Sequence, residues 1–224
     1  MVREIGVQDL LDVVTLPYVV HQVDPSRTRR AWVHGRAVVI DGSPARPAAG
    51  RHGIVYTCLG PPEDLEALMS HLAQAAPRPW RVSVERPARL PPSWVLSSSH
   101  SWSWMTTSTR VSAGDRWRVE SLDGVRDAVE IDDLLDAANV DSFARPGQPG
   151  VEVWMGIREM VRHSSRLLAA GALQRMHDRT LHMRGVSVLP ENRGAGAGRA
   201  LSAALTNHAH QSFRLSVVGR DLGV

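Results

Sequence analysis

A glycine-rich stretch near the C-terminal end, residues 193–199, most constrains what this chain can fold into. It reads RGAGAGR, follows the apolar run 186–190 and precedes a helical pattern over 200–211. Glycine has no Cβ, so the backbone can turn tightly there, and the first turn of the following helix leaves several N–H groups without partners. These donors and the positive end of the helix dipole favour an anion. The stretch therefore predicts a strand, a phosphate-binding turn and a helix.

The spacing of these glycines does not fit two common phosphate loops. A P-loop ends in Gly-Lys-Ser or Gly-Lys-Thr, and this chain contains no lysine, since all 26 of its basic residues are arginine. The dinucleotide fingerprint G-x-G-x-x-G cannot be placed on Gly194, Gly196 and Gly198, because these glycines alternate. The pattern that fits is R-x-x-G-x-G after V-x-V-x-P, over residues 186–201.

This pattern closely resembles the acetyl-CoA motif of the GNAT superfamily of N-acetyltransferases, more strongly over 180–212 than over 117–180. The resemblance implies a GNAT-like α/β fold with a mixed sheet. It implies that the pantetheine arm of the cosubstrate acetyl-CoA pairs with the backbone of Val186 and Val188, as in strand addition, and that an N–H near Val188 stabilises the oxyanion. It also implies that the pyrophosphate lies on the backbone of Arg193, Gly194, Ala195, Gly196, Ala197, Gly198 and Arg199.

Members of this family transfer acetyl directly from the coenzyme to an amine. The resemblance therefore implies an acyltransferase that acts on a small-molecule or peptide amine, without a metal. Candidates for the general base are Glu152, Glu159 and His182, which lie on or beside strands that flank the coenzyme strand. A carboxylate or an imidazole, or a water that it orients, suits this role.

The chain departs from the family after its last expected strand, residues 213–218. Family members usually continue with a helix and two more strands, often with a tyrosine that protonates the leaving thiolate. Both tyrosines of this chain, Tyr18 and Tyr56, lie in its N-terminal half. We therefore expect weakened acetyl transfer. We also expect the edge of the last strand to be covered by the N-terminal half or by a second chain, as in a homodimer.

An internal similarity suggests two halves. Residues 53–85 are predicted to run strand, loop, helix, strand, and residues 181–218 repeat that order. The first helix is expected to bury an apolar face, made of Leu65, Leu68, Met69 and Leu72. Its loop has Gly60-Pro61-Pro62 in place of the glycine-rich turn, and proline has no N–H to offer a phosphate. We expect a degenerate GNAT-like half over 1–110 that binds no coenzyme, and a C-terminally shortened N-acetyltransferase domain over 111–224.

Two other functions fit the same loop. A catalytically silent acyl-CoA-binding module, regulatory or structural, would use it for the same coenzyme, and a nucleotide-binding protein would use it for a different diphosphate. The net charge of +3 is spread along the chain, which argues against nucleic acid as a partner. The sequence has no run of about 18 apolar residues, so we expect no membrane span. The single cysteine, Cys58, favours a reducing, cytoplasmic setting and is expected in a core rather than as a nucleophile.

Overall fold

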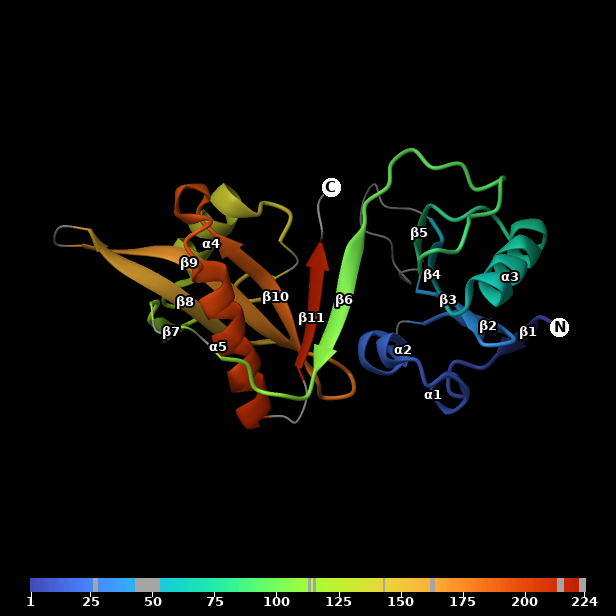
Figure 1. Cartoon of the computed structure of the whole chain (residues 1–224), viewed down its shortest axis with the longest axis horizontal. Coiled ribbons are helices and arrows are strands. Elements are labelled where there is room, and N and C mark those ends of the chain that lie inside the picture. The colour runs from blue at the N-terminus through green and yellow to red at the C-terminus, as the bar shows by residue number, and fades with distance from the viewer. Residues whose placement is uncertain are drawn as a thin grey trace. The chain divides into compact units, whose positions relative to one another are not determined.

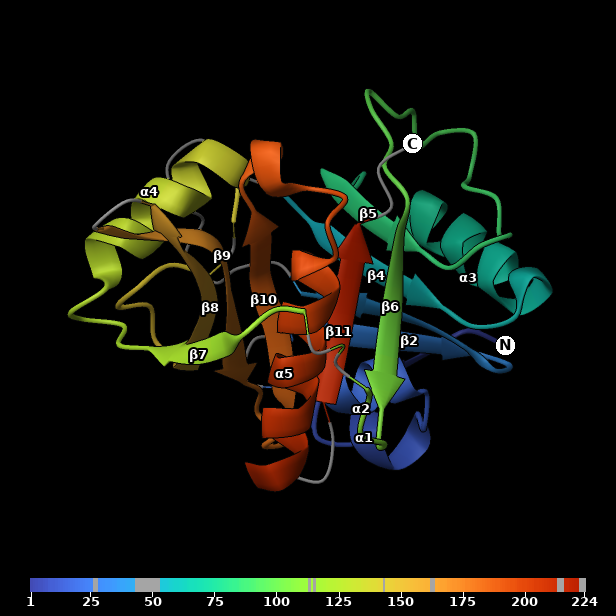
Figure 2. The ribbon, with the colours of Figure 1, turned by 60° about the vertical axis from the view of Figure 1, so that its left-hand side comes forward.

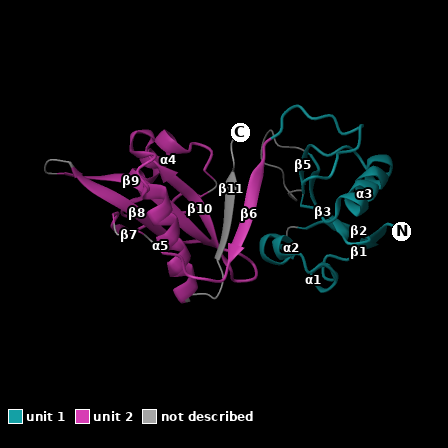
Figure 3. Ribbon diagram, viewed as in Figure 1, with its two compact units in different colours: residues 1–99 teal, residues 100–224 magenta. Residues whose placement is uncertain are grey.

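The chain forms two compact units, residues 1–99 and 100–224 (Figure 3). The computed structural model describes residues 1–25, 28–42, 53–112, 114, 116–142, 144–161, 164–212 and 216–221. Each unit holds one sheet with its own helices (Figure 1), so the mixed α/β class with two helix-flanked sheets is confirmed. The units divide before β6 (Trp102–Thr107) rather than after residue 110, because β6 hydrogen-bonds into the second sheet.

The first unit has a five-stranded sheet in the order β1-β2-β3-β4-β5. The first four strands pair antiparallel in turn, and β4 and β5 pair in parallel, joined by the helix α3. The elements are β1 (Arg3–Ile5), α1 (Leu10–Val13), α2 (Pro17–Gln22), β2 (Arg30–His34), β3 (Ala37–Asp41), β4 (Val55–Leu59), α3 (Pro62–Ala75) and β5 (Arg81–Val84).

The helix α3 packs its predicted apolar face into the core of this unit. Its buried side chains are Leu65, Leu68, Met69 and Leu72. Pro62 suits the first turn of the helix because no intrahelical bond needs an N–H there. Cys58 of β4 is buried in the same core, and burial raises the pKa of its thiol. The thiol therefore stays protonated at neutral pH, which fits a packing role.

The second unit has a six-stranded sheet in the order β6-β11-β10-β9-β8-β7. Strands β7 to β10 pair antiparallel in turn, and β10 and β11 pair in parallel, joined by the helix α5. After β6, the elements are β7 (Val119–Leu122), α4 (Ala128–Ala138), β8 (Val151–Val161), β9 (Ser164–Arg175), β10 (Leu181–Val188), a 3-10 turn (Pro190–Asn192), α5 (Ala197–Ser212) and β11 (Ser216–Asp221).

The last strand runs further than predicted and is covered at its edge. It extends to Asp221 instead of ending at 218, and residues 213–215 of the prediction lie outside the described residues. β6 pairs antiparallel with β11 from Ser216 to Asp221. β6 lies within the predicted N-terminal half, 1–110, but belongs to the second unit, so the edge is covered from within that unit.

The two units share one order of elements. In each, a helical segment lies between the first two antiparallel strands, and a helix joins the last two strands in parallel. In this order α3 corresponds to α5, and the loop before α3 corresponds to the glycine-rich loop before α5. The strand β6 has no counterpart in the first sheet.

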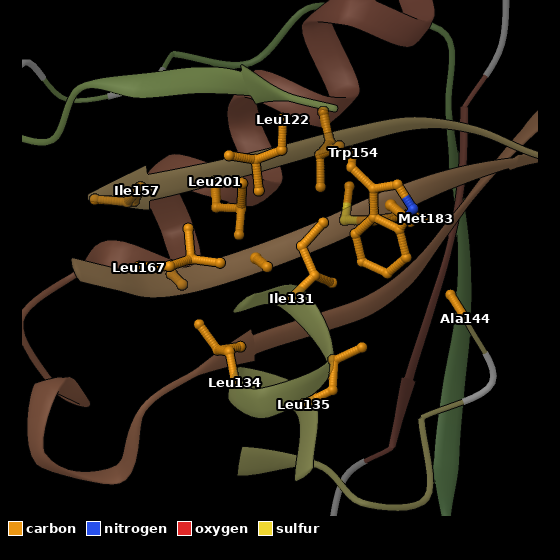
Figure 4. Packing of buried hydrophobic residues seen from close by; sticks show 14 of the residues in the cluster. Leu122, Ile131, Leu134, Leu135, Ala144, Trp154, Ile157, Leu167, Met183 and Leu201 are labelled. Carbon is orange, nitrogen blue, oxygen red and sulfur yellow. The ribbon is translucent and has the colours of Figure 1, made fainter. Parts of the chain in front are cut away.

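The core of the second unit lies on both sides of its sheet. Residues 167–173 of β9 are all buried, so both faces of this strand are covered. The covering helices are α4 and α5. Ile131 and Leu135 of α4 have no exposed surface, and neither have Leu201 and Leu205 of α5. Figure 4 shows part of this packing. The core thereby anchors α5, and with it the loop that precedes α5.

Replacing Gly156 of β8 with alanine tests this packing. A Cβ there would lie 2.7 Å from the Cδ1 atoms of Leu122 and Leu167 and 3.0 Å from the Ala169 backbone oxygen. We expect Gly156→Ala to lower the free energy of unfolding by about 1–3 kcal/mol, as overpacking does, measured by urea denaturation. Gly114→Ala is the control, because a Cβ at Gly114 meets nothing within 4 Å. Equal stability of the two variants would contradict the packing.

Candidate functional site

The glycine-rich segment follows β10 directly. The chain turns through Pro190–Asn192, and α5 begins at Ala197. Between them Gly194 and Gly196 have φ angles of +79° and +88°, a left-handed conformation that residues with a Cβ rarely adopt. The predicted strand, turn and helix are therefore present, and the turn requires glycine at these two positions.

Backbone donors at the start of α5 border an open hollow. The first hydrogen bond of the helix runs from the Ala200 N–H to the Gly196 carbonyl, at 3.1 Å, so the N–H groups of residues 197–199 precede the helical ladder. The hollow has a volume of about 330 Å³. Its lining residues are Val188, Asn192, Arg193, Gly194, Gly196, Ala197, Gly198 and Arg199. Of the residues predicted to hold a coenzyme, only Val186 and Ala195 are outside this lining.

Two side chains fasten the loop to neighbouring elements. Arg193 Nε donates to the Val188 carbonyl at 3.2 Å, and Arg193 Nη2 donates to the Ala138 carbonyl at 3.0 Å. Ala138 ends α4, where the helix dipole favours a cation. Trp117 Nε1 donates to the Ala195 carbonyl at 2.9 Å. Sequence reasoning missed the Ala138 and Trp117 contacts, because their partners are 55 and 78 positions apart and no local pattern marks them.

Beside this loop, β10 separates from β11. In the part of the chain that the structure describes, the two strands pair only over Leu181–Met183. β11 continues along β6, whereas β10 follows β9 through a bulge between Arg184 and Ser187. Gly185 lies in this bulge with φ +59°. Among the described residues, β10 beyond Met183 therefore has no strand partner on the side of β11.

The amide of Val188 faces this gap. Leu189 N–H donates to the Leu168 carbonyl beside β9 at 2.9 Å, and successive residues along a strand direct their backbone groups to opposite sides. The Val188 carbonyl accordingly points away from β9 and accepts from Arg193. The Val188 N–H shares that side, so it is placed to donate to a group that enters the gap.

The two predicted carboxylate bases do not line the hollow. The Glu152 carboxylate binds the guanidinium of Arg175 at two points, one of them Arg175 Nη2 to Glu152 Oε2 at 2.7 Å. Arg175 pairs with Leu181, at the end of β10 that lies roughly 23 Å from the loop by strand rise. Glu159 lies on β8, opposite Arg166 of β9, and β9 separates β8 from β10.

The predicted imidazole base, His182, is buried within β10. It is 3% exposed, and its Nδ1 has no hydrogen-bond partner among the described residues. Burial, with a contribution from the charge of Arg184, lowers the pKa of His182 to about 3. The ring is therefore neutral at pH 7 and a weak base. It also lies opposite Val217, at the end of β10 that still pairs with β11.

The lining of the hollow contains no carboxylate and no imidazole. Among the described residues, no cluster of three or more His, Cys, Asp or Glu side chains is arranged to hold a metal ion. None of the described helices combines the length and the apolar character that a membrane span requires. The arrangement thus offers backbone amides and a strand edge, and the described lining residues of the hollow include no carboxylate or imidazole.

Among solved structures, this chain is similar to several acetyltransferases at low sequence identity. No protein-family model matches the sequence, and no curated protein matches it. A GNAT-family acetyltransferase from Colwellia psychrerythraea has 13% identity and a TM-score of 0.48, with 99% of this chain and 90% of that chain covered. A GCN5-related N-acetyltransferase from Kribbella flavida has 17% identity and a TM-score of 0.46, with 87% and 80% covered. At these identities and TM-scores, activity and substrate have to be argued from the loop itself.

The neutral state of His182 makes a prediction about pH. Its pKa is about 3 in the folded chain and about 6.5 in an unfolded one. Between these values only the unfolded state binds the proton, so the free energy of unfolding falls as the pH drops from 6.5 toward 3. We expect His182→Leu to flatten this dependence between pH 6 and pH 4, measured by urea denaturation. An unchanged slope would show that His182 titrates alike in both states.

Proposed function

We propose that this chain is an acetyl-CoA-dependent N-acetyltransferase that binds the pyrophosphate of the coenzyme at the start of α5. The hollow over residues 193–199 carries the proposal. Gly194 and Gly196 bring the backbone around it in a left-handed conformation, and the first N–H groups of α5 border it. A helix N-terminus carries about half a positive charge, and unpaired amides at such a terminus suit a diphosphate.

The gap beside β10 supports a ligand with an amide-bearing arm rather than a bare nucleotide. Val188 belongs both to the lining of the hollow and to the strand edge that β11 leaves. A pantetheine arm could therefore run from the hollow along β10 and pair with the backbone of Val186 and Val188, as an added strand does. Neither ATP nor NAD has such an arm, so this edge favours an acyl-CoA over either of them.

In the proposed reaction the amine nitrogen attacks the thioester carbonyl, the C–S bond breaks, and coenzyme A leaves as the thiolate. The Val188 N–H would stabilise the negative charge on the carbonyl oxygen, and the strand edge would hold the thioester for attack. The amine must reach the thioester as the free base. Glu152, Glu159 and His182 stay predictions for the group that takes its proton, and none of them lines the hollow.

We also propose that the first unit is a copy of this fold that binds no coenzyme. The Gly60 N–H of its corresponding loop already donates to Glu85 Oε2 at 2.7 Å. The next two residues are prolines without an N–H, and Glu63 and Asp64 bring negative charge to the first turn of α3. β4 and β5 pair from Val55 to Cys58, so no gap opens between them there.

The glycine loop is tested by replacing Gly196 with valine. Valine at φ +88° is strained, by about 1–3 kcal/mol, and its Cβ would lie 3.9 Å from Trp117 Nε1, so the substitution would distort the loop that carries the donors. We expect Gly196→Val to weaken acetyl-CoA binding about 10- to 100-fold, measured by calorimetry. Gly147→Val is the matched control, because Gly147 also has a positive φ, +77°, and open space around its Cβ. Unchanged affinity in the Gly196 variant would contradict the site.

Turnover is tested with acetyl-CoA and a panel of small and peptide amines, by following the free thiol that transfer releases. Acetylation of any amine supports an enzyme. Binding without transfer across the panel would instead indicate a silent acyl-CoA-binding module. Displacement of acetyl-CoA by ATP or NAD at similar affinity would indicate a nucleotide-binding protein.

Calorimetry also tests the first unit. We expect one acetyl-CoA per chain, because the loop before α3 has its glycine amide bound to Glu85 and lacks further donors at the prolines. The Gly196→Val variant then shows no residual high-affinity site. Two sites per chain, or a full-affinity site that survives in that variant, would overturn the assignment of the first unit as non-binding.

A further inference from the structure

The connection between β6 and β7 crosses α5 and is fastened at two points (Figure 2). Near its start, Val111 N–H donates to Asn207 Oδ1 at 3.0 Å, and Asn207 Nδ2 donates to the Val111 carbonyl at 2.9 Å. Near its end, Trp117 Nε1 donates to the Ala195 carbonyl at 2.9 Å. Asn207 belongs to α5 and Ala195 to the loop before it, so the connection holds both the helix and the loop.

The contact at Ala195 has a directional consequence for the hollow. A trans peptide unit is planar, and its C=O and N–H point in opposite directions. The Ala195 carbonyl points to the Trp117 indole, so the N–H of the same peptide unit, which belongs to Gly196, points away from the indole. Gly196 lines the hollow. Fixing the carbonyl of this unit therefore fixes the direction of one of the amides that an anion would meet.

The loop cannot fix this peptide unit by itself. Glycines flank Ala195 on both sides, and a Cβ at Gly194 would meet nothing within 4 Å. Glycine backbone is freer than that of other residues, and the packing that would restrain it is missing at Gly194. The indole itself is half-buried, and the guanidinium carbon of Arg116 lies 5.6 Å from the centre of the Trp117 ring, a cation–π distance. The hydrogen bond that restrains the Ala195–Gly196 peptide unit thus comes from outside the loop, from Trp117.

We propose that Trp117 is a positioning residue of the coenzyme site, whose indole N–H orients the Ala195–Gly196 peptide so that the Gly196 amide meets the ligand. The inference rests on the proposed function for its ligand, but the restraint of the loop does not depend on any ligand. Trp117 acts through Ala195, so its loss changes the ordering of the amides and leaves the hollow itself in place.

Two substitutions separate the hydrogen bond from the packing of the ring. Trp117→Phe keeps an aromatic ring and loses the donor. Trp117→His loses bulk and keeps an N–H in a five-membered ring at a similar reach. Loss of one hydrogen bond corresponds to about a 2- to 10-fold change. We expect Trp117→Phe to weaken acetyl-CoA binding by that factor, Trp117→His to weaken it less, and the exposed Trp80→Phe control to bind as the wild type.

A second measurement works without coenzyme. Trypsin cleaves after arginine, and a loosened loop is cut faster. We expect the Arg193–Gly194 bond of Trp117→Phe to be cleaved about 2- to 10-fold faster than in the wild type, with the site identified by mass spectrometry. We expect no such change in Trp80→Phe.

The outcomes are distinguishable. If the wild type binds no acetyl-CoA, the proposed function fails, and the cleavage rates alone decide whether Trp117 restrains the loop. If cleavage at Arg193 is unchanged in Trp117→Phe, the positioning role is overturned. If Trp117→Phe binds acetyl-CoA as tightly as the wild type, or more tightly than Trp117→His, the hydrogen bond does not serve the site.

Discussion

Among the described residues, β10 separates from β11 after Met183, and the proposed binding of an acyl-CoA depends on this separation. Parallel strands joined by a helix would otherwise share hydrogen bonds along their length, and no strand edge would be open to a ligand. The bulge at Gly185 carries β10 along β9, and β6 keeps β11 in the sheet from Ser216 to Asp221. The hollow before α5 meets this open edge at Val188. The hollow and the strand edge are therefore continuous at Val188.

The first unit shows that the order of elements alone does not produce such a site. Its strands and crossover helix follow the same order as those of the second unit. Its last two strands, however, stay paired from Val55 to Cys58 of β4. In the corresponding loop, the carboxylate of Glu85 accepts a hydrogen bond from the Gly60 N–H. A fixed internal carboxylate beside the loop also opposes a second anion by charge. The difference between the units therefore lies in the loop residues and in the pairing of the last strands.

Local features of the structure were predictable from the sequence, and contacts across long separations were not. The apolar face of α3 and the glycine turn before α5 depend on residues within one or two turns of each other, so spacing reveals them. Burial depends on partners elsewhere in the chain. His182 has a suitable side chain for a base, but its neutral, enclosed state appears only when β9, β10 and β11 are assembled. The contact of Trp117 with Ala195 and the pairing of β6 with β11 also join residues far apart in the sequence, so no local pattern predicted them.

Glycines create the loop's shape and also make it costly to order. Fixing the backbone of one residue costs about 1–2 kcal/mol, and glycine loses more freedom than other residues. If the loop became ordered only when a ligand binds, this free-energy cost would weaken the affinity for the ligand. Arg193 and Trp117 restrain the loop through the carbonyls of Val188, Ala138 and Ala195. All three bonds occupy acceptors, so this restraint takes no N–H donor from the loop; within the loop itself, the Arg193 N–H donates to the Pro190 carbonyl at 3.3 Å.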